Sequence, residues 1–321
     1  MRAAASKSTV TRFAQWVAGH PVLVGLGLLV LFFSLCNPLF FTEGNARAIL
    51  RQLAPIGIYS FPVALLLIGR SIDLSLGAVV GLSSVIGIEV MNAVGMTGGL
   101  AAFLGVGLGA GIVNGLLVSY ARLDPIIVTM GTSFVFRGLS LSVSGGKAGV
   151  PPAAFLDAFR YEVLGFRPEI YIMLAVLALC WWLLHVSRAG RSLYAAGENE
   201  RVAFLMGVKV RRLQFLMHCA TGLAGGVVAI VSVAKLGLSG GGIGESLTLP
   251  VITAVFLGGV DFGGGMGTIP GVVAGVLFMG VLQAGLLILG IGEFVQQIIV
   301  GAVLIAAIYM STRSRKRLSS Q

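Results

Sequence analysis

The sequence predicts an all-α, polytopic membrane protein of about ten transmembrane helices, some of them short or broken. Composition is the first reason: of 321 residues, 57% are hydrophobic and only 11% are charged, whereas soluble domains are about 45–50% apolar and about 25% charged. Spacing is the second, because apolar runs recur along the chain at intervals near the ~20 residues that cross a bilayer as a helix. The runs lack the alternation of barrel strands, so helices are expected.

Glycine, proline and charged residues divide the apolar runs into ten segments, which together form a single transmembrane domain over residues 1–321. The run 247–259 is too short to cross a bilayer alone at ~1.5 Å per residue, so we expect it to be half-inserted or broken. The first run resembles a signal peptide but lacks a small-residue cleavage site after Cys36, so we expect a retained span. The predicted spans are 20–36, 54–69, 72–94, 97–120, 125–143, 169–186, 213–236, 247–259, 266–290 and 294–311.

Charge places both termini in the cytoplasm, because ten spans put them on one side and basic residues gather at both ends. Residues 1–19 are then a cytoplasmic N-terminal segment and residues 312–321 a basic cytoplasmic tail. The loop 187–212 falls on the same side, and the loop 144–168 lies outside. The net charge of +10 is explained by this topology, and no nucleic acid partner is expected. The terminal basic residues are Arg2, Lys7, Arg12, Arg313, Arg315, Lys316 and Arg317.

Glycine is frequent, with 47 residues, and several pairs have the GxxxG spacing that lets helix backbones approach closely in lipid. We expect these pairs to pack helices within the chain, with dimerisation through one of them as the alternative. The pairs are Gly105/Gly109, Gly107/Gly111, Gly111/Gly115, Gly222/Gly226 and Gly271/Gly275.

The sequence contains no nucleotide-binding GxxxxGK[ST] motif and no HExxH or CxxC. The three histidines, His20, His185 and His218, lie at predicted span edges and are interpreted as polar tips at the membrane interface. We therefore expect no catalytic residue, metal site or cofactor in this chain. An intramembrane enzyme would need a nucleophile and a base, and the sequence offers no such arrangement.

The loop 187–212 predicts a short amphipathic helix that begins near Glu200, with Asn199 as its N-cap. Ala203, Phe204 and Met206 give this helix an apolar side. Such a helix on the cytoplasmic face favours a docked partner. A helix that lies on the membrane surface, held there by basic residues, is the alternative.

The loop closely resembles the coupling loop of permeases in the ribose-type sugar ABC importer family, and other landmarks follow in order. Residues 71–77, Ser-Ile-Asp-Leu-Ser-Leu-Gly, resemble the family's Gly-Ile-Asp-Leu-Ser-x-Gly. Residues 124–132, Asp-Pro-Ile-Ile-Val-Thr-Met-Gly-Thr, resemble its Pro-x-x-Val-Thr-Leu-Gly-Thr segment. The glycine-rich stretch 256–268 is similar to its Val-Leu-Gly-Gly…Gly-Gly-x-Gly-Ser. The chain has Arg70-Ser71 where the family usually has Gly-Gly.

The resemblance implies a permease of the bacterial inner membrane that carries a small sugar-like solute. Its partners would be a second permease, the same or a related chain, cytoplasmic ATP-binding subunits that hold ATP and magnesium, and a periplasmic sugar-binding protein. Residues 247–252, Leu-Thr-Leu-Pro-Val-Ile, look more like permeases for autoinducer 2 and rhamnose-like deoxysugars. The alternative is an ion-coupled secondary transporter, but Asp73 and Glu89 are the only acidic residues in the spans of the first half, and no acid–histidine relay is evident.

Two sets of candidate residues follow. Polar groups inside spans are costly, and amides and hydroxyls bond sugar hydroxyls, so they are candidates for a translocation path, with hydrogen bonding between helices as the alternative. Asp73 alternatively caps a helix start. The path candidates are Asp73, Ser75, Asn114, Thr129, Thr132, Gln283, Gln296 and Gln297. The coupling candidates, implied by the resemblance, are Gly197, Glu198, Asn199, Glu200, Ala203, Gly207 and Val208.

Overall fold

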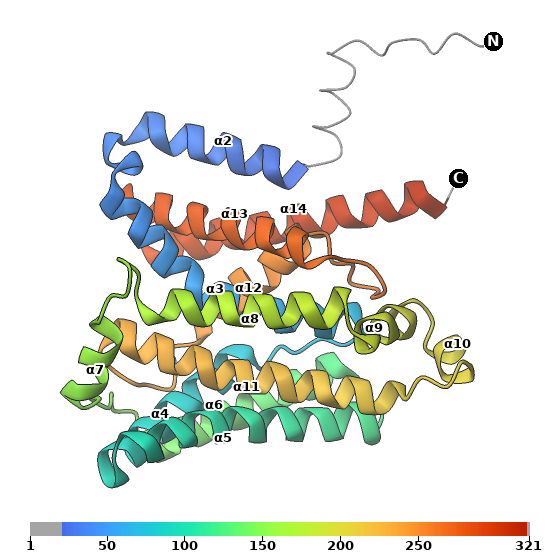
Figure 1. Cartoon of the computed structure of the whole chain (residues 1–321), viewed down its shortest axis with the longest axis horizontal. Coiled ribbons are helices and arrows are strands. Elements are labelled where there is room, and N and C mark those ends of the chain that lie inside the picture. The colour runs from blue at the N-terminus through green and yellow to red at the C-terminus, as the bar shows by residue number, and fades with distance from the viewer. Residues whose placement is uncertain (1–20, 320–321) are drawn as a thin grey trace.

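Every apolar run that the sequence predicts to be a helix is one in the computed structural model, which describes residues 21–319 (Figure 1). The predicted cytoplasmic segment 1–19, with His20, lies outside the described residues. The helices are α2 Pro21–Cys36, η1 Pro38–Phe41, α3 Glu43–Ile68, α4 Leu76–Val94, α5 Met96–Gly115, η2 Leu116–Tyr120, α6 Pro125–Ser144, α7 Ala153–Arg160, α8 Pro168–His185, α9 Arg188–Glu198, α10 Glu200–Leu205, α11 Val210–Leu236, α12 Glu245–Leu257, α13 Ile269–Ile288 and α14 Glu293–Ser319.

Seven helices of the described chain are long and apolar enough to cross a membrane: α3, α4, α5 with η2, α6, α8, α11 and α13. The other three predicted spans correspond to shorter apolar helices, namely α2, α12 and the part of α14 up to Tyr309. With 13 residues, α12 agrees with the expectation that this segment is too short to cross alone. The count of ten crossings stays a prediction. The backbone of α14 continues to Ser319 and so includes most of the predicted basic tail.

The two ends of the helix bundle carry different elements. In Figure 1 the short helices α9 and α10 lie at one end of the bundle and α7 at the other. The link between α3 and α4, residues 69–75, lies at the α9 end, because the backbone N of Gly265 and α9 itself both meet the C-terminal residue of α3, Ile68. Charge in the sequence predicts that the α9 end faces the cytoplasm.

The centre of the bundle is formed by α3 and α12. Every residue from Leu53 to Ile68 in α3 is buried, and so is every residue from Pro250 to Leu257 in α12. Around α3 pack α8, α11, α12 and α13, while α12 also contacts α14. Two prolines inside α3, Pro55 and Pro62, remove backbone donors, which a buried helix tolerates better than a lipid-exposed one because neighbours surround it.

Glycines bring α5 and α11 into backbone contact, as the GxxxG spacing predicted. A methyl group added at Gly107 would lie 2.7 Å from the backbone N of Gly226, and one added at Gly222 would lie 2.6 Å from the backbone N of Gly111. Gly271 and Gly275 approach the backbone of α12 in the same way, and Gly115 approaches Phe215 of α11. Packing within the chain is therefore confirmed for these pairs. Only Gly105/Gly109 has open space around both members.

Candidate functional site

The loop 187–212 contains two helices, α9 and α10, and not one. The predicted cap of α10 is confirmed, since Oδ1 of Asn199 accepts a hydrogen bond from the backbone N of Val202 at 3.1 Å. The helix α9 was not predicted, because Gly190 and Gly197 are poor helix formers. Its cap was the available signal: Oγ of Ser187 accepts from the backbone N of Gly190 at 3.2 Å.

Four of the five apolar residues from Val202 to Met206, in α10 and its C-cap, are exposed. Val202 is 50% exposed, Phe204 69%, Leu205 77% and Met206 76%. We call these four residues the α10 face. Soluble surfaces rarely present so many large apolar side chains together unless a partner or a membrane covers them. Two neighbouring candidates, Glu198 and Glu200, are also exposed.

Ala203 corrects an expectation about which side of α10 meets a partner. The sequence placed Ala203 with Phe204 and Met206 on the apolar side of this helix, but Ala203 is only 1% exposed and packs with Ala196 and Val210. Val208 is partly buried against the same cluster. Gly207 does lie in open space, with a left-handed φ of 84°. The approach face is therefore formed by the large side chains and not by Ala203.

The helix α9 is anchored to the bundle at Gly197. A methyl group on Gly197 would lie 2.9 Å from Cα of Gly265 and still closer to the backbone N of Gly265 and O of Ile68. The backbone N of Gly265 donates to O of Ile68 at 2.9 Å. The hydroxyl of Tyr194, whose pKa is raised by burial, donates to O of Gly267 at 2.6 Å. This contact thus joins three segments: the loop 187–212, the glycine-rich stretch 256–268 and the end of α3.

Arg70 occupies a backbone conformation that glycine adopts without strain. Its φ is 62°, in the left-handed region, and its backbone N donates to O of Leu67 at 2.9 Å. The family that the sequence resembles usually has glycine at the position of Arg70. The turn that follows α3 is nevertheless formed. A left-handed non-glycine residue costs about 1–2 kcal/mol.

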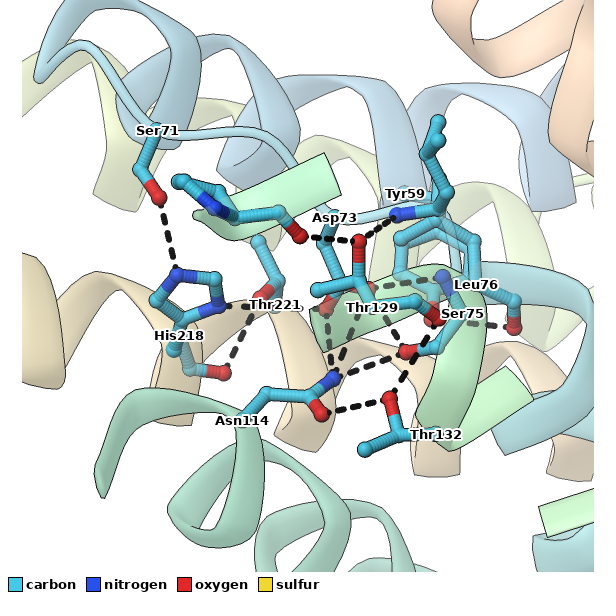
Figure 2. Close-up of polar contacts among 12 residues, drawn as sticks. Tyr59, Ser71, Asp73, Ser75, Leu76, Asn114, Thr129, Thr132, His218 and Thr221 are labelled. Atoms are coloured by element: carbon cyan, nitrogen blue, oxygen red, sulfur yellow. Dashed lines mark hydrogen bonds and ion pairs between the residues drawn. The ribbon is translucent and has the colours of Figure 1, made fainter. Parts of the chain in front are cut away.

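Five of the eight path candidates meet in one buried polar network beside the link 69–75 (Figure 2). Oδ1 of Asp73 accepts from the backbone N of Ser75 at 2.8 Å and from its hydroxyl at 2.6 Å. Nδ2 of Asn114, on α5, donates to Oγ of Ser75 at 2.8 Å and lies 3.4 Å from Oδ2 of Asp73. Asp73 therefore shapes the turn before α4, whose N-cap, Ser75, makes no side-chain capping bond.

Two threonines extend the network to α6. The hydroxyl of Thr132 donates to Oδ1 of Asn114 at 2.7 Å. The hydroxyl of Thr129 accepts from the backbone N of Leu74 at 3.0 Å and donates to O of Pro125 at 2.7 Å. Apart from Thr132, which is partly buried, the network members are closed to solvent. The link 69–75 is thereby tied to both α5 and α6.

His218 joins the network from α11, which corrects its interpretation as a polar tip at the membrane interface. Its side chain is fully buried, with Nε2 at 2.9 Å from Oγ of Ser71 and Nδ1 at 3.9 Å from Oδ2 of Asp73. A contact between a histidine of α11 and an acidic residue of the link 69–75 is therefore present, which the sequence did not indicate. The spacing His218, Gly222, Gly226 could have indicated that His218 is buried, because residues four apart share one helix face.

The remaining path candidates lie beside the start of α12. Gln283, Gln296 and Gln297 line a cavity of 370 Å³ together with Glu245 and Glu293. This cavity is bounded by the start of α12, the end of α13 and the start of α14, so it is separate from the Asp73 network. The candidates thus form two groups, one buried and one facing a cavity.

A charged pair lies beside this cavity. Nε of Arg137, on α6, is 3.0 Å from Oε1 of Glu245, on α12, and the two side chains are 54% and 47% exposed. Charged side chains within membrane-spanning helices face a bundle interior, a partner or water, because exposure to lipid is costly. This face of α6 and α12 is therefore a poor candidate for contact with lipid.

Within residues 21–319 no cluster of three or more histidine, cysteine or acidic residues is placed to hold a metal. Proteins that move solutes through membranes share three features with this chain. They have long apolar helices, short helices anchored outside them and a polar cavity between helices. The chain belongs to one family of such proteins: residues 45–308 match the model described as the permease component of a branched-chain amino acid transport system.

Curated relatives cover most of the chain. It is 32% identical over 289 residues to the autoinducer 2 import system permease protein LsrD of Photorhabdus laumondii, covering 87% of this chain and 86% of the relative. The protein of the same name from Escherichia coli K12 is 35% identical over 263 residues, or 79% of each chain. The one from Photorhabdus temperata is 31% identical over 288 residues, covering 87% and 86%. No match was found among solved structures.

Proposed function

We propose that the chain is the membrane-spanning permease of an ABC importer in the bacterial inner membrane, and that its solute is autoinducer 2 or a similar small sugar-like molecule. The class of solute is supported by the names of its relatives. The observation that carries the mechanism is the α10 face: exposed apolar side chains on a short helix that is anchored to the centre of the bundle through Gly197.

The α10 face fits a groove on a cytoplasmic ATP-binding subunit. Short amphipathic helices bind partner proteins by laying apolar anchors into a groove, and Phe204, Leu205 and Met206 are anchors of suitable size. Of the candidates around them, Asn199 caps the helix, Val208 packs against the cluster beside it and Gly197 anchors α9. ATP and magnesium belong to that subunit, and this chain is not an enzyme in its own right.

Motion of the ATP-binding subunits would reach the spans through α9. Since Gly197 and Gly265 meet at Ile68, a displacement of α9 moves the end of α3 and the link 69–75. That link is hydrogen-bonded to α5, α6 and α11 through Asn114, Thr129 and His218. A packed, hydrogen-bonded network changes between discrete arrangements and does not deform continuously, which suits alternating access.

The solute would enter at the cavity lined by Gln283, Gln296 and Gln297. Amide and carboxylate groups can bond the hydroxyls of a polyol, and Glu245 and Glu293 add two acceptors there. The Arg137–Glu245 pair indicates that this side of the chain faces a second permease or water. A periplasmic sugar-binding protein then delivers the solute at the end that carries α7, opposite α9 and α10 (Figure 1).

An ion-coupled secondary transporter is disfavoured by family membership, even though the Asp73–His218 pair is present. In the proposed mechanism this pair ties α11 to the link 69–75. It does not carry protons.

The test is a charge placed on the α10 face. Leu205→Asp is expected to abolish both co-purification of the ATP-binding subunit and uptake of the solute, with normal abundance in the membrane because Leu205 is 77% exposed. Leu205→Met is the matched control, since it keeps an apolar side chain of similar volume at the same position. If Leu205→Asp keeps the subunit and transports at the parental rate, α10 lies on the membrane surface and the proposed coupling is wrong.

A further inference from the structure

A basic cavity lies beside α10; Phe204 of the α10 face lines it, but the transport proposal uses none of its basic residues. It measures 1140 Å³ and is bounded by α10, the start of α11 and the turn between η2 and α6. Two acidic residues, Asp124 and Glu200, also line it, but the Asp124 carboxylate already accepts from the backbone N of Ile126 at 2.9 Å and of Ile127 at 3.2 Å. Its basic residues are Arg70, Arg122, Arg201, Lys209, Arg211 and Arg212.

The six basic residues of this cavity outnumber its two acidic residues. Within the described part of the chain, none of the six basic side chains forms an ion pair with an acidic one. Like charges gathered around one space repel each other, and a bound anion would relieve that repulsion.

Backbone strain accompanies two of these charges. Arg70 and Arg122 have φ values of 62° and 59°, and the described chain has only one other non-glycine residue with positive φ, Leu164. Such conformations are uncommon for residues with a side chain and gather at functional sites. The positive-inside rule explains why basic residues lie at this end of the bundle. It does not explain why arginine stands at two positions that glycine would occupy without strain.

An apolar surface begins at the mouth of the cavity. Tyr120 and Leu123 line the cavity and are 50% and 49% exposed. Next to them, Leu116 of η2 is 47% exposed and Ile127 of α6 is 74% exposed. A ligand with an anionic head and apolar chains would match both the basic wall and this adjoining surface.

We propose that the cavity binds the phosphate group of an anionic phospholipid from the leaflet that α10 faces, with the acyl chains against η2 and the start of α6. Guanidinium groups pair with phosphate oxygens through two parallel hydrogen bonds, so arginine is the suitable residue. The bound lipid contacts Arg201 of α10, Arg70 of the link 69–75 and Arg122 between η2 and α6. It therefore braces α10 against the spans. This inference is independent of the identity of the solute.

The experiment measures lipid binding to the purified full chain in a neutral detergent. Native mass spectrometry counts bound lipids during titration with phosphatidylglycerol or phosphatidylcholine, and inorganic phosphate is added as a competitor. The parental chain is expected to retain phosphatidylglycerol selectively. Arg122→Gln with Arg212→Gln should lower that affinity roughly 30-fold, since each basic residue near an anionic lipid contributes ~1 kcal/mol. Binding of phosphatidylcholine should not change.

Arg188→Gln with Arg191→Gln is the matched control, because both residues are exposed on α9 and outside the cavity. If the first double variant does not accumulate, Arg122→Gly removes one charge and relieves the left-handed backbone, and it should weaken binding roughly fivefold.

Equal affinity for the two lipids, or an equal loss in the control, overturns the proposal. Displacement by inorganic phosphate at equal concentration shows a site for a soluble anion. Unchanged lipid binding together with loss of the ATP-binding subunit assigns the cavity to that protein interface. Either result also overturns the proposal.

Discussion

The anchor at Gly197 makes the most demanding prediction about coupling. Gly197→Ala places a methyl group against the backbone of both Ile68 and Gly265, and neither can move away without stretching the 2.9 Å hydrogen bond between them. Overpacking of this kind costs about 1–3 kcal/mol. Loss of a hydrogen bond adds about 0.5–1.5 kcal/mol.

The sum, about 1.5–4.5 kcal/mol, shifts the equilibrium between anchored and detached α9 by at least roughly 10-fold. The α10 face is untouched by this substitution, so the ATP-binding subunit should still dock. Hydrolysis would then continue while transport falls, and the amount of solute moved per ATP should drop by a factor of that order.

The assay uses proteoliposomes that contain the whole importer, with uptake and ATP hydrolysis measured in the same sample. Arg191→Ala serves as the control, because Arg191 lies on the exposed side of the same helix. Solute moved per ATP at the parental ratio in Gly197→Ala would show that α9 does not transmit motion through this contact. Loss of the ATP-binding subunit from Gly197→Ala would instead show that the anchor and the dock are not separable.

Three further predictions concern stability and topology. Asn114→Leu leaves the hydroxyls of the polar network without their amide partner and should lower stability in detergent by about 1–3 kcal/mol, measured as a fall in melting temperature. Gly111→Leu should reduce abundance in the membrane on immunoblots because α5 and α11 can no longer meet, whereas Gly105→Leu, in open space, should not. Reporters fused after Lys147 and Gln321 should be periplasmic and cytoplasmic respectively; the same compartment for both would contradict the ten-span topology.

Helix positions were accessible to sequence reasoning because lipid imposes a strong constraint on length and composition. Even the shortness of α12 followed from the count of residues between Leu247 and Gly259. The cap at Asn199 was also predictable, since a cap is a contact between residues three apart in sequence.

The direction of α10 was not predictable. Residues 202–206 are all apolar, so the sequence did not show which of these side chains face the bundle. Only the neighbouring cluster shows that Ala203 points inward, towards Ala196 and Val210, and that Phe204 points outward.

Contacts across long sequence separations account for the rest. Asp73 and Asn114 were singled out as costly polar residues, but their mutual hydrogen bond is a tertiary feature. His218 meets Ser71 across 147 residues, and no periodic pattern connects the two positions. The sequence therefore indicated which polar residues needed a partner, and the packing of α5, α6 and α11 determined which partner each one found.

The enclosed position of α3 has a consequence for how the protein is made. Of the seven long spans, α3 has the largest share of buried residues in its most apolar stretch, 78%. It also has the lowest mean hydropathy, 1.4. The helices that surround it, α8, α11, α12 and α13, are all synthesised later. A weakly apolar segment partitions less readily from the insertion machinery into lipid. During biogenesis α3 is therefore covered only after the later helices have been inserted. In chains truncated before α11, this least hydrophobic of the long spans would stay exposed to the bilayer.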